Sequence, residues 1–443
     1  MSSKMFLKNV TQYIHSKEAK QHVTKELEHH LNVTTINLMK HGFTKVEAEE
    51  KAVAQMGSPM TLGKSMNRIY KPKWDMWLIG GVVLLLILSF LQLSSVDYTF
   101  QFGHDLKDSY MRRQVIYVLL ALGIIFACTF YDYRRLKKYS VFLYGVAALG
   151  LVWLNVAPNY FLNGESLLKF GPFVIHAWTL LPLITIGLAG LCTYTAFKWW
   201  HFIALYIVTV IAFLNVPNMT VAFLYSCIAA VLFTYSTFSK KVKYIGWSLA
   251  IFALFIVSAY LVYIYRYTDQ VYQLTRIHSF LHPELYEGDY GHDIITLNMV
   301  LGDAGWFGAS DNMPFFGASD NMPFFGAHTD YALVQLIHAY GYSAGLAVII
   351  CIILIAIRIL YIVRTMPSSF GKYIVISAAT LYITQSVYSV LMIVGLLPLI
   401  DIPLPFISYG ATSLFINAML IGFISSVYRR KMFLQLSLKK ASL

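Results

Sequence analysis

The chain has 443 residues, of which 58% are hydrophobic and only 13% are charged, against about 45–50% and about 25% in soluble domains. This composition excludes a soluble globular enzyme and indicates a membrane protein. The formal net charge of +12 would suit a nucleic-acid-binding protein, but basic cytoplasmic loops explain the same excess, so we expect no nucleic-acid partner. All four cysteines fall inside apolar runs, which predicts buried thiols rather than disulfides.

The first seventy residues differ from the rest of the chain because they are polar and mixed in charge. They contain residues that begin and end helices, at Gly42, Thr44, Glu47, Gly57, Ser58 and Pro59. Thr44 and Glu47 have capping-box spacing, glycine commonly ends helices, and proline is favoured at the first helical position. We therefore predict three or four short helices over residues 1–70. The motif AVAQMGSPMTLGKSMNRI resembles the small cytoplasmic prefix domain that precedes some membrane permeases.

Four histidines in this segment recur at near-heptad spacing, with Glu26 one turn from two of them: His15, His22, His29 and His30. A metal site needs such groups to converge, whereas a solvated helix face explains the spacing without further requirements. We expect no metal here.

Beyond this domain the sequence predicts an all-α, polytopic membrane protein with about ten transmembrane helices. A helix needs about 20 apolar residues to cross a bilayer. Runs near this length are Trp77–Leu93, Val115–Phe130, Val141–Val156, Leu180–Phe197, Phe202–Leu214, Val221–Tyr235, Trp247–Tyr265, Tyr331–Val363, Tyr373–Leu397 and Phe406–Val427. The eighth run is too long for one straight crossing, so we expect a bend near Gly341 or Gly345.

The placement of basic residues supports ten spans. With this count the basic clusters fall on one side of the membrane: Lys71, Lys73, Arg134, Arg135, Lys137, Lys138, Lys198, Lys240, Lys241, Lys243, Arg358, Arg364, Lys372, Arg429, Arg430 and Lys431. Because cytoplasmic loops are enriched in Lys and Arg, both termini, including the tail 431–443, are predicted to be cytoplasmic.

The longest predicted loop after the first domain covers residues 266–329, on the outer side. A loop of this length in a compact protein is usually functional. It contains a perfect tandem repeat, FGASDNMPF, at Phe307–Phe315 and Phe316–Phe324. Two copies are too few for a repeat architecture, and both a recent duplication and an error in assembling the sequence would produce them.

Asp330 lies at the outer edge of the membrane, immediately before the eighth apolar run. A carboxylate near that depth costs free energy and is functional by default. Aspartate is also a favoured helix N-cap and complements the helix dipole. The residue chemistry alone leaves both roles open.

The segment Gly395–Ser413, GLLPLIDIPLPFISYGATS, carries three prolines between two apolar runs. A proline removes a helical hydrogen bond, and the freed carbonyl finds no water in lipid, so we predict a buried re-entrant corner. The segment resembles the PLPFISYG signature of the SEDS family (FtsW/RodA/SpoVE), and the resemblance covers residues 75–430. The structural signature consists of Gly395, Pro398, Pro403, Pro405, Ser408 and Gly410.

The resemblance implies an enzyme of the bacterial cell membrane that polymerises peptidoglycan from lipid II, together with a class B penicillin-binding protein. SEDS proteins carry His-Thr-Asp where this chain has His328, Thr329 and Asp330. This implies that Asp330 is catalytic and that its two neighbours contact the substrate. Asp330 would take the proton from the acceptor sugar hydroxyl as a general base.

A leaving pyrophosphate needs a cation to stabilise it. Arg276 in RIHSFLHP matches a family element after the seventh span and is our first choice, ahead of Lys169. An arginine at this depth also suits an interfacial anchor. A divalent cation is a second option, with ligands among His278, His282, Asp289, His292 and Asp293, although scattered polar loop residues explain these equally well.

Several family positions are altered in this chain. Thr179 stands where the family has the glutamate of Gln-Pro-Ser-Glu, Asn218 replaces an aspartate, and Asp401 replaces a glycine of the corner. Further departures are Ser166, Leu167, Leu168, Gly326, His338, Ala339, Ser389 and Ala411. Polar groups that would line a substrate groove have become neutral or small, so the chain is a divergent member.

Three functions follow from these observations. The first is a lipid II-dependent peptidoglycan glycosyltransferase acting in division, elongation or sporulation. The second is a catalytically weakened paralogue that acts as a membrane interaction protein through its first domain. The third is a flippase for a lipid-linked precursor, because broken helices suit transport.

Overall fold

The computed structural model describes the chain except residues 1, 16, 71–73, 97–106, 163–164, 172, 217, 268–277, 287–290, 310–327, 367–368 and 442–443. The chain forms two compact units. The first unit consists of Met1–Asp75 and Val427–Leu443, and the second consists of Met76–Ser426.

The N-terminal part of the first unit is a small helical bundle. Thr44 caps its third helix in the predicted capping box, with its N–H donating to Glu47 Oε2 at 3.1 Å. Pro59 opens the fourth helix, whereas the second helix, at 24 residues, is longer than predicted. The four helices are α1 (Ser3–Gln12), α2 (Lys17–Lys40), α3 (Lys45–Gln55) and α4 (Pro59–Ile69).

Apolar side chains from these helices form one core, with Phe6, Val10, Val23 and Leu31 almost completely buried. His22 lies 3.8 Å from Glu26, and the hydroxyl of Tyr70 donates to the same carboxylate at 2.6 Å. This carboxylate therefore has local partners that explain its position without a metal ion.

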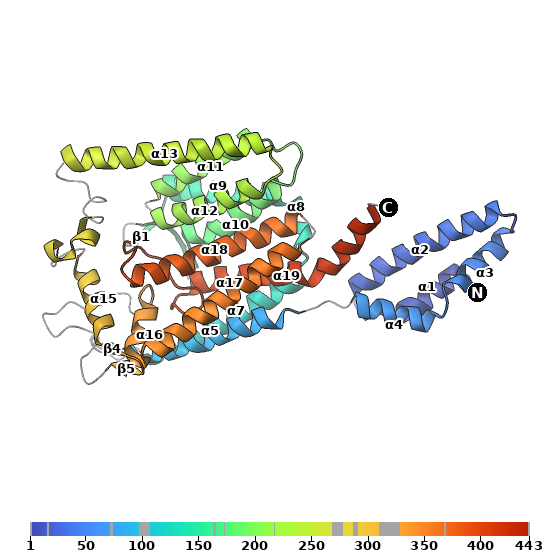
Figure 1. The fold of residues 1–443 in the computed structure, drawn as a ribbon, viewed down its shortest axis with the longest axis horizontal. Coiled ribbons are helices and arrows are strands. Elements are labelled where there is room, and N and C mark those ends of the chain that lie inside the picture. Colours follow the sequence, from blue (N-terminus) through green and yellow to red (C-terminus); the bar gives the residue numbers. More distant parts are fainter. Residues whose placement is uncertain are drawn as a thin grey trace. The chain divides into compact units, whose positions relative to one another are not determined.

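The second unit is a helical bundle (Figure 1). Its long helices are α5 (Met76–Ser94), α7 (Lys107–Phe130), α9 (Ser140–Val156), α10 (Ala177–Leu191), α11 (Trp199–Asn215), α12 (Met219–Tyr235), α13 (Lys240–Tyr267), α17 (Tyr342–Thr365) and α18 (Ser369–Ile393), together with the part of α19 (Ala411–Ala441) that precedes Val427. Within the described residues, five helices are long and apolar enough to cross a membrane, and four shorter apolar helices accompany them. The prediction of an all-α, polytopic membrane protein is confirmed.

Short elements complete the second unit. They are α8 (Arg134–Lys138), the 3-10 helix η1 (Pro283–Tyr286), α15 (Gly291–Asp303), α16 (Ala332–Tyr340), the strands β1 (Tyr160–Leu162), β2 (Glu165–Phe170) and β3 (Phe173–Ile175), and the hairpin β4 (Ala304–Gly305) and β5 (Gly308–Ala309). The sheet β1-β2-β3 is antiparallel and pairs Tyr160 with Leu167 and Leu168 with Ile175. These strands were not predicted from the sequence.

Each of the ten predicted apolar runs overlaps one of these helices, and the eighth overlaps two, α16 and α17. Gly341, with a φ of +85°, separates α16 from α17, which confirms the predicted bend. Several predicted boundaries were wrong, since α7 begins at Lys107 and α13 at Lys240, before the predicted runs. The helix of the fourth apolar run, α10, ends at Leu191 because a turn closes there, with Thr193 Oγ1 donating to the carbonyl of Gly190 at 2.7 Å. The helix of the tenth apolar run, α19, begins only at Ala411 rather than near Phe406, after Gly410 with a φ of +148°.

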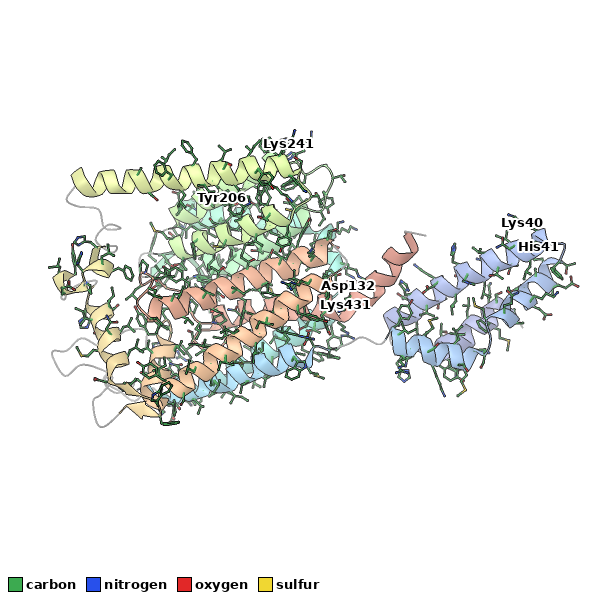
Figure 2. The ribbon with its side chains drawn as sticks, in the orientation of Figure 1. Lys40, His41, Asp132, Tyr206, Lys241 and Lys431 are labelled. Atoms are coloured by element: carbon green, nitrogen blue, oxygen red, sulfur yellow. The ribbon has the colours of Figure 1, made fainter. Side chains whose placement is uncertain are left out.

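The bundle has two distinct ends. Figure 1 shows β1, α15, β4, β5 and α16 at one end, which we call the site end. Figure 2 shows Asp132 and Lys241 at the opposite end. This opposite end, which we call the basic end, also carries Arg134, whose guanidinium pairs with Asp132 at 2.8 Å.

Candidate active site

The proline-rich segment between α18 and α19 forms a non-helical corner. Its residues from Ile402 to Ser408 are mostly buried, while Asp401 is exposed. Ser408 closes the turn, because its Oγ accepts from the N–H of Leu404 at 2.8 Å. Phe406, only 2% exposed, has a φ of +66°, which a non-glycine residue rarely adopts. Several backbone groups of the corner are thus paired within the protein, in keeping with the predicted buried corner.

Contacts with α18 hold the start of the corner. The hydroxyl of Tyr388 donates to the carbonyl of Pro398 at 3.1 Å, and the N–H of Ile400 donates to Met392 Sδ at 3.3 Å. Gly395, with a φ of +77°, lets the chain leave α18. Pro403, Pro405 and Gly410 complete the turn into α19.

The corner contacts the turn that carries His328, Thr329 and Asp330. The N–H of Tyr409 donates to the carbonyl of His328 at 2.8 Å. The His328 ring packs against Tyr409 and against Tyr110 of α7, with centroids 5.7 and 5.3 Å apart. Two segments about eighty residues apart in sequence are therefore in contact beside Asp330.

Asp330 lies in this turn, two residues before α16 begins at Ala332. The N-cap of α16 is Tyr331, so the N-cap role considered for Asp330 is wrong. The Asp330 carboxylate accepts from Thr329 Oγ1 at 3.5 Å. Burial, and next the negative charge of Asp401, raise the pKa of Asp330 from 3.8 to about 7. A carboxyl group with this pKa exchanges protons near neutral pH.

A second carboxylate, Glu165 of β2, lies near Asp401. Its Oε1 accepts from Asn218 Nδ2 at 2.6 Å, while Asn218 Oδ1 accepts from the N–H of Val221 at 2.9 Å. Asn218, only 3% exposed, therefore caps α12 and orients Glu165 at once. Burial and the charge of Asp401 raise the pKa of Glu165. Asp401 thus acts electrostatically on both Glu165 and Asp330.

The predicted cations are placed differently. Lys169 is exposed on β2 with its ammonium 4.8 Å from the ring centroid of Tyr160. Its backbone N–H donates to Asn159 Oδ1 at 2.7 Å. Arg276, Asp289 and most of the tandem repeat lie outside the described residues.

The histidines of the outer loop lie close to one another. The His278 and His282 rings are 5.3 Å apart, and His282 Nδ1 lies 3.7 Å from Glu284 Oε1. No group of three His, Cys, Asp or Glu side chains in the described part of the chain could hold a metal ion.

Arg113 on α7 and Glu165 also belong to this region, although neither was predicted from the sequence. The charge of the Arg113 guanidinium acts on the hydroxyl of Tyr409, and Glu165 contacts Asn218. A signal for Arg113 was present, because Lys107, Arg112 and Arg113 precede an apolar run on the side that should carry few basic residues. No comparable signal pointed to Glu165, because the paired strands β1 and β2 that place it were not predicted.

An apolar cavity of about 410 Å³ lies between α11, α12 and α13. Tyr206, labelled in Figure 2, lines it together with Phe202, Phe233 and Trp247. The indole Nε1 of Trp247 donates to Thr234 Oγ1 at 3.2 Å. The cavity therefore offers apolar surface from three helices.

The fold and the site define a polytopic membrane protein with a carboxylate site at one end of its bundle. The family model described as cell cycle protein, FtsW/RodA/SpoVE, matches residues 75–432. The chain belongs to this family.

The chain is similar to curated relatives of this family at low identity. It is 26% identical over 164 residues to the probable peptidoglycan glycosyltransferase FtsW of Trichlorobacter lovleyi, covering 37% of this chain and 42% of the relative. It is 24% identical over 394 residues to the protein of the same name from Geobacter sulfurreducens, covering 84% and 99%. Peptidoglycan glycosyltransferase MrdB of Escherichia coli is 26% identical over 198 residues, covering 42% and 50%. The chain thus spans half or less of the length of two of these relatives and nearly all of the third.

Solved structures share the fold. A chain from a peptidoglycan synthase complex that coordinates polymerisation and crosslinking has a TM-score of 0.65 at 20% identity, covering 81% of this chain and 98% of its own length. The rod shape determining protein RodA of Thermus thermophilus has a TM-score of 0.55 at 18% identity, covering 81% and 97%.

Proposed function

We propose that the protein is a peptidoglycan glycosyltransferase that polymerises lipid II. The observation that carries this proposal is the Asp330 carboxylate. It lies in a turn that is fixed to the signature corner, and its pKa is raised to about 7. A general base is most effective when its pKa lies near the working pH. Relatives named as peptidoglycan glycosyltransferases support the same reaction.

In the proposed reaction Asp330 takes the proton from the acceptor sugar hydroxyl. The oxygen of that hydroxyl attacks the anomeric carbon of the donor sugar, and a new glycosidic bond forms. The bond between the anomeric carbon and the pyrophosphate oxygen breaks, and undecaprenyl pyrophosphate leaves with both electrons. His328 and Thr329 would contact the substrate from the same turn.

The remaining assignments form part of this proposal. The apolar cavity lined by Tyr206 and Trp247 suits a hydrocarbon chain, since water is released when apolar surfaces meet. A class B penicillin-binding protein is the proposed partner. The basic end would face the cytoplasm together with both termini, and residues 1–70 would form a cytoplasmic prefix domain ahead of the membrane domain 75–430.

The test is polymerisation of purified lipid II in the presence of a class B penicillin-binding protein. Asp330→Asn preserves the shape of the side chain and removes the base, so we expect glycan strands from the wild type and none from the variant. Glu284→Gln is the matched control, because Glu284 is an exposed carboxylate of the outer loop. Strands of normal length from Asp330→Asn would disprove the role of Asp330.

A further inference from the structure

A cation on α7 lies within the aromatic contacts beside Asp330. Tyr110, Arg113 and Tyr117 are three and four residues apart, so they share one face of this helix. Tyr110 packs against Tyr409 with centroids 5.0 Å apart, and Tyr117 does so at 5.9 Å. Tyr110 also packs against His328. This face of α7 therefore meets both the signature corner and the turn that ends at Asp330.

The Arg113 side chain is directed at Tyr409. Burial and the neighbouring Tyr117 raise the pKa of the Tyr409 hydroxyl. The positive charge of Arg113 and its hydrogen bond to this hydroxyl oppose that rise. Arg113 itself is exposed. A guanidinium has five N–H donors in a fixed fork that matches phosphate oxygens. The exposed guanidinium therefore has N–H donors beyond the one that Tyr409 uses.

The charge of Arg113 also stands at an unusual end of the bundle. Lys107, Arg112 and Arg113 open α7 at the end where it meets the turn of Asp330, whereas Lys241 and Arg134 belong to the basic end. Membrane proteins keep most basic residues on the cytoplasmic side. Basic residues at the opposite end depart from this distribution. The binding of an anion at that end would explain their presence.

We propose that Arg113, together with the phenol groups of Tyr409 and Tyr117, binds the phosphate groups of a lipid-linked pyrophosphate at the site end. This inference rests on the proposed function and assigns the phosphate contact to a residue other than Arg276 and Lys169. Asp330 follows two residues after His328, whose carbonyl binds Tyr409, so the phosphate contact lies next to the base. The guanidinium would neutralise charge that develops as the bond to pyrophosphate breaks.

The chain offers a matched control for Arg113. Arg112 is the next residue on α7, about 100° around the helix, and its Nε donates to the carbonyl of Asp108 at 3.2 Å. Arg113→Gln and Arg112→Gln remove the same charge from the same helical turn. Only the first removes a group that faces Tyr409.

The binding assay measures the thermal unfolding midpoint of the full-length protein in detergent with inorganic pyrophosphate. We expect pyrophosphate to stabilise the wild type and Arg112→Gln, but not Arg113→Gln. Arg113→Lys keeps the charge without the fork and should respond weakly, which covers the case in which the glutamine variant folds poorly. In the polymerisation assay Arg113→Gln should lose about 100-fold in rate, and Arg112→Gln about twofold or less.

Two results would overturn the inference. One is equal stabilisation of Arg113→Gln and the wild type by pyrophosphate. The other is a response of Arg113 to vesicles containing phosphatidylglycerol but not to pyrophosphate, which would assign the residue to membrane lipid headgroups. The proposed function fails separately, if Asp330→Asn polymerises lipid II, and the pyrophosphate response would still decide the role of Arg113.

Discussion

Asp401→Asn should move the acid limb of the activity profile to lower pH. Asp330 must be ionised to accept a proton, so activity is present above its pKa of about 7 and is lost as the pH falls. The negative charge of Asp401 contributes to the rise from 3.8, with burial the larger cause. Removing that charge without changing the side-chain volume should therefore lower the pKa of Asp330 by only part of the rise.

A shift of about one pH unit serves to illustrate the size of the effect. If Asp401 accounts for about one pH unit, the ionised fraction of Asp330 at pH 6 increases from about a tenth to about half. Activity at pH 6 should then rise about fivefold, while activity at pH 8 should change little. These changes in activity are expected when the wild type and Asp401→Asn are equally saturated with lipid II.

The assay is the initial rate of lipid II polymerisation between pH 5 and pH 9, about two units either side of the pKa. Asp401→Glu keeps the charge and should retain the wild-type profile, which makes it the matched control. An acid limb that stays in place in Asp401→Asn would refute the electrostatic coupling between Asp401 and Asp330. A limb that moves to higher pH would refute the sign of the argument.

Three further predictions concern stability. A raised pKa in the folded state disfavours folding once the carboxyl group ionises. At pH 8, Asp330→Asn should therefore be more stable to thermal unfolding than the wild type, by about 1–3 kcal/mol after allowance for partial exposure. This gain in stability should vanish when the pH falls below 3.8, the ordinary pKa of an aspartate. Asn218→Asp would place two carboxylates 2.6 Å apart and should destabilise the folded protein by about 1–3 kcal/mol. Adding Glu165→Gln to this variant should recover most of the lost stability. Equal melting temperatures of the single and double variants would contradict the pairing of Asn218 with Glu165. Gly341→Ala should destabilise by about 1–3 kcal/mol, because the φ is +85° and a Cβ would lie 2.3 Å from the carbonyl oxygen of Trp306; chemical denaturation in detergent would detect this.

The helices could be predicted from sequence because each property that defines them is local. Apolar runs long enough to cross a bilayer mark the spans, and Gly341 marks the bend through its own backbone conformation. The capping box at Thr44 depends on a residue three positions away. Such features require no knowledge of what packs against them.

The arrangement of the site was less predictable because its contacts join distant segments. Glu165 and Asn218 are 53 residues apart, and their hydrogen bond depends on the six-residue strand β2, which has no strong sequence pattern of its own. The corner was predictable as an interruption by proline. Its contact with His328 was not, because nothing in either segment specifies the other.

The altered family positions acquire a different meaning once the contacts are known. Sequence comparison suggested that acidic groups of the groove had been lost, since Thr179 and Asn218 are neutral. The structure places Glu165 against Asn218 and brings the charge of Asp401 to bear on Glu165 and Asp330. Negative charge thus enters the same region from a strand and from the corner. The altered positions therefore do not by themselves argue against the activity that we propose.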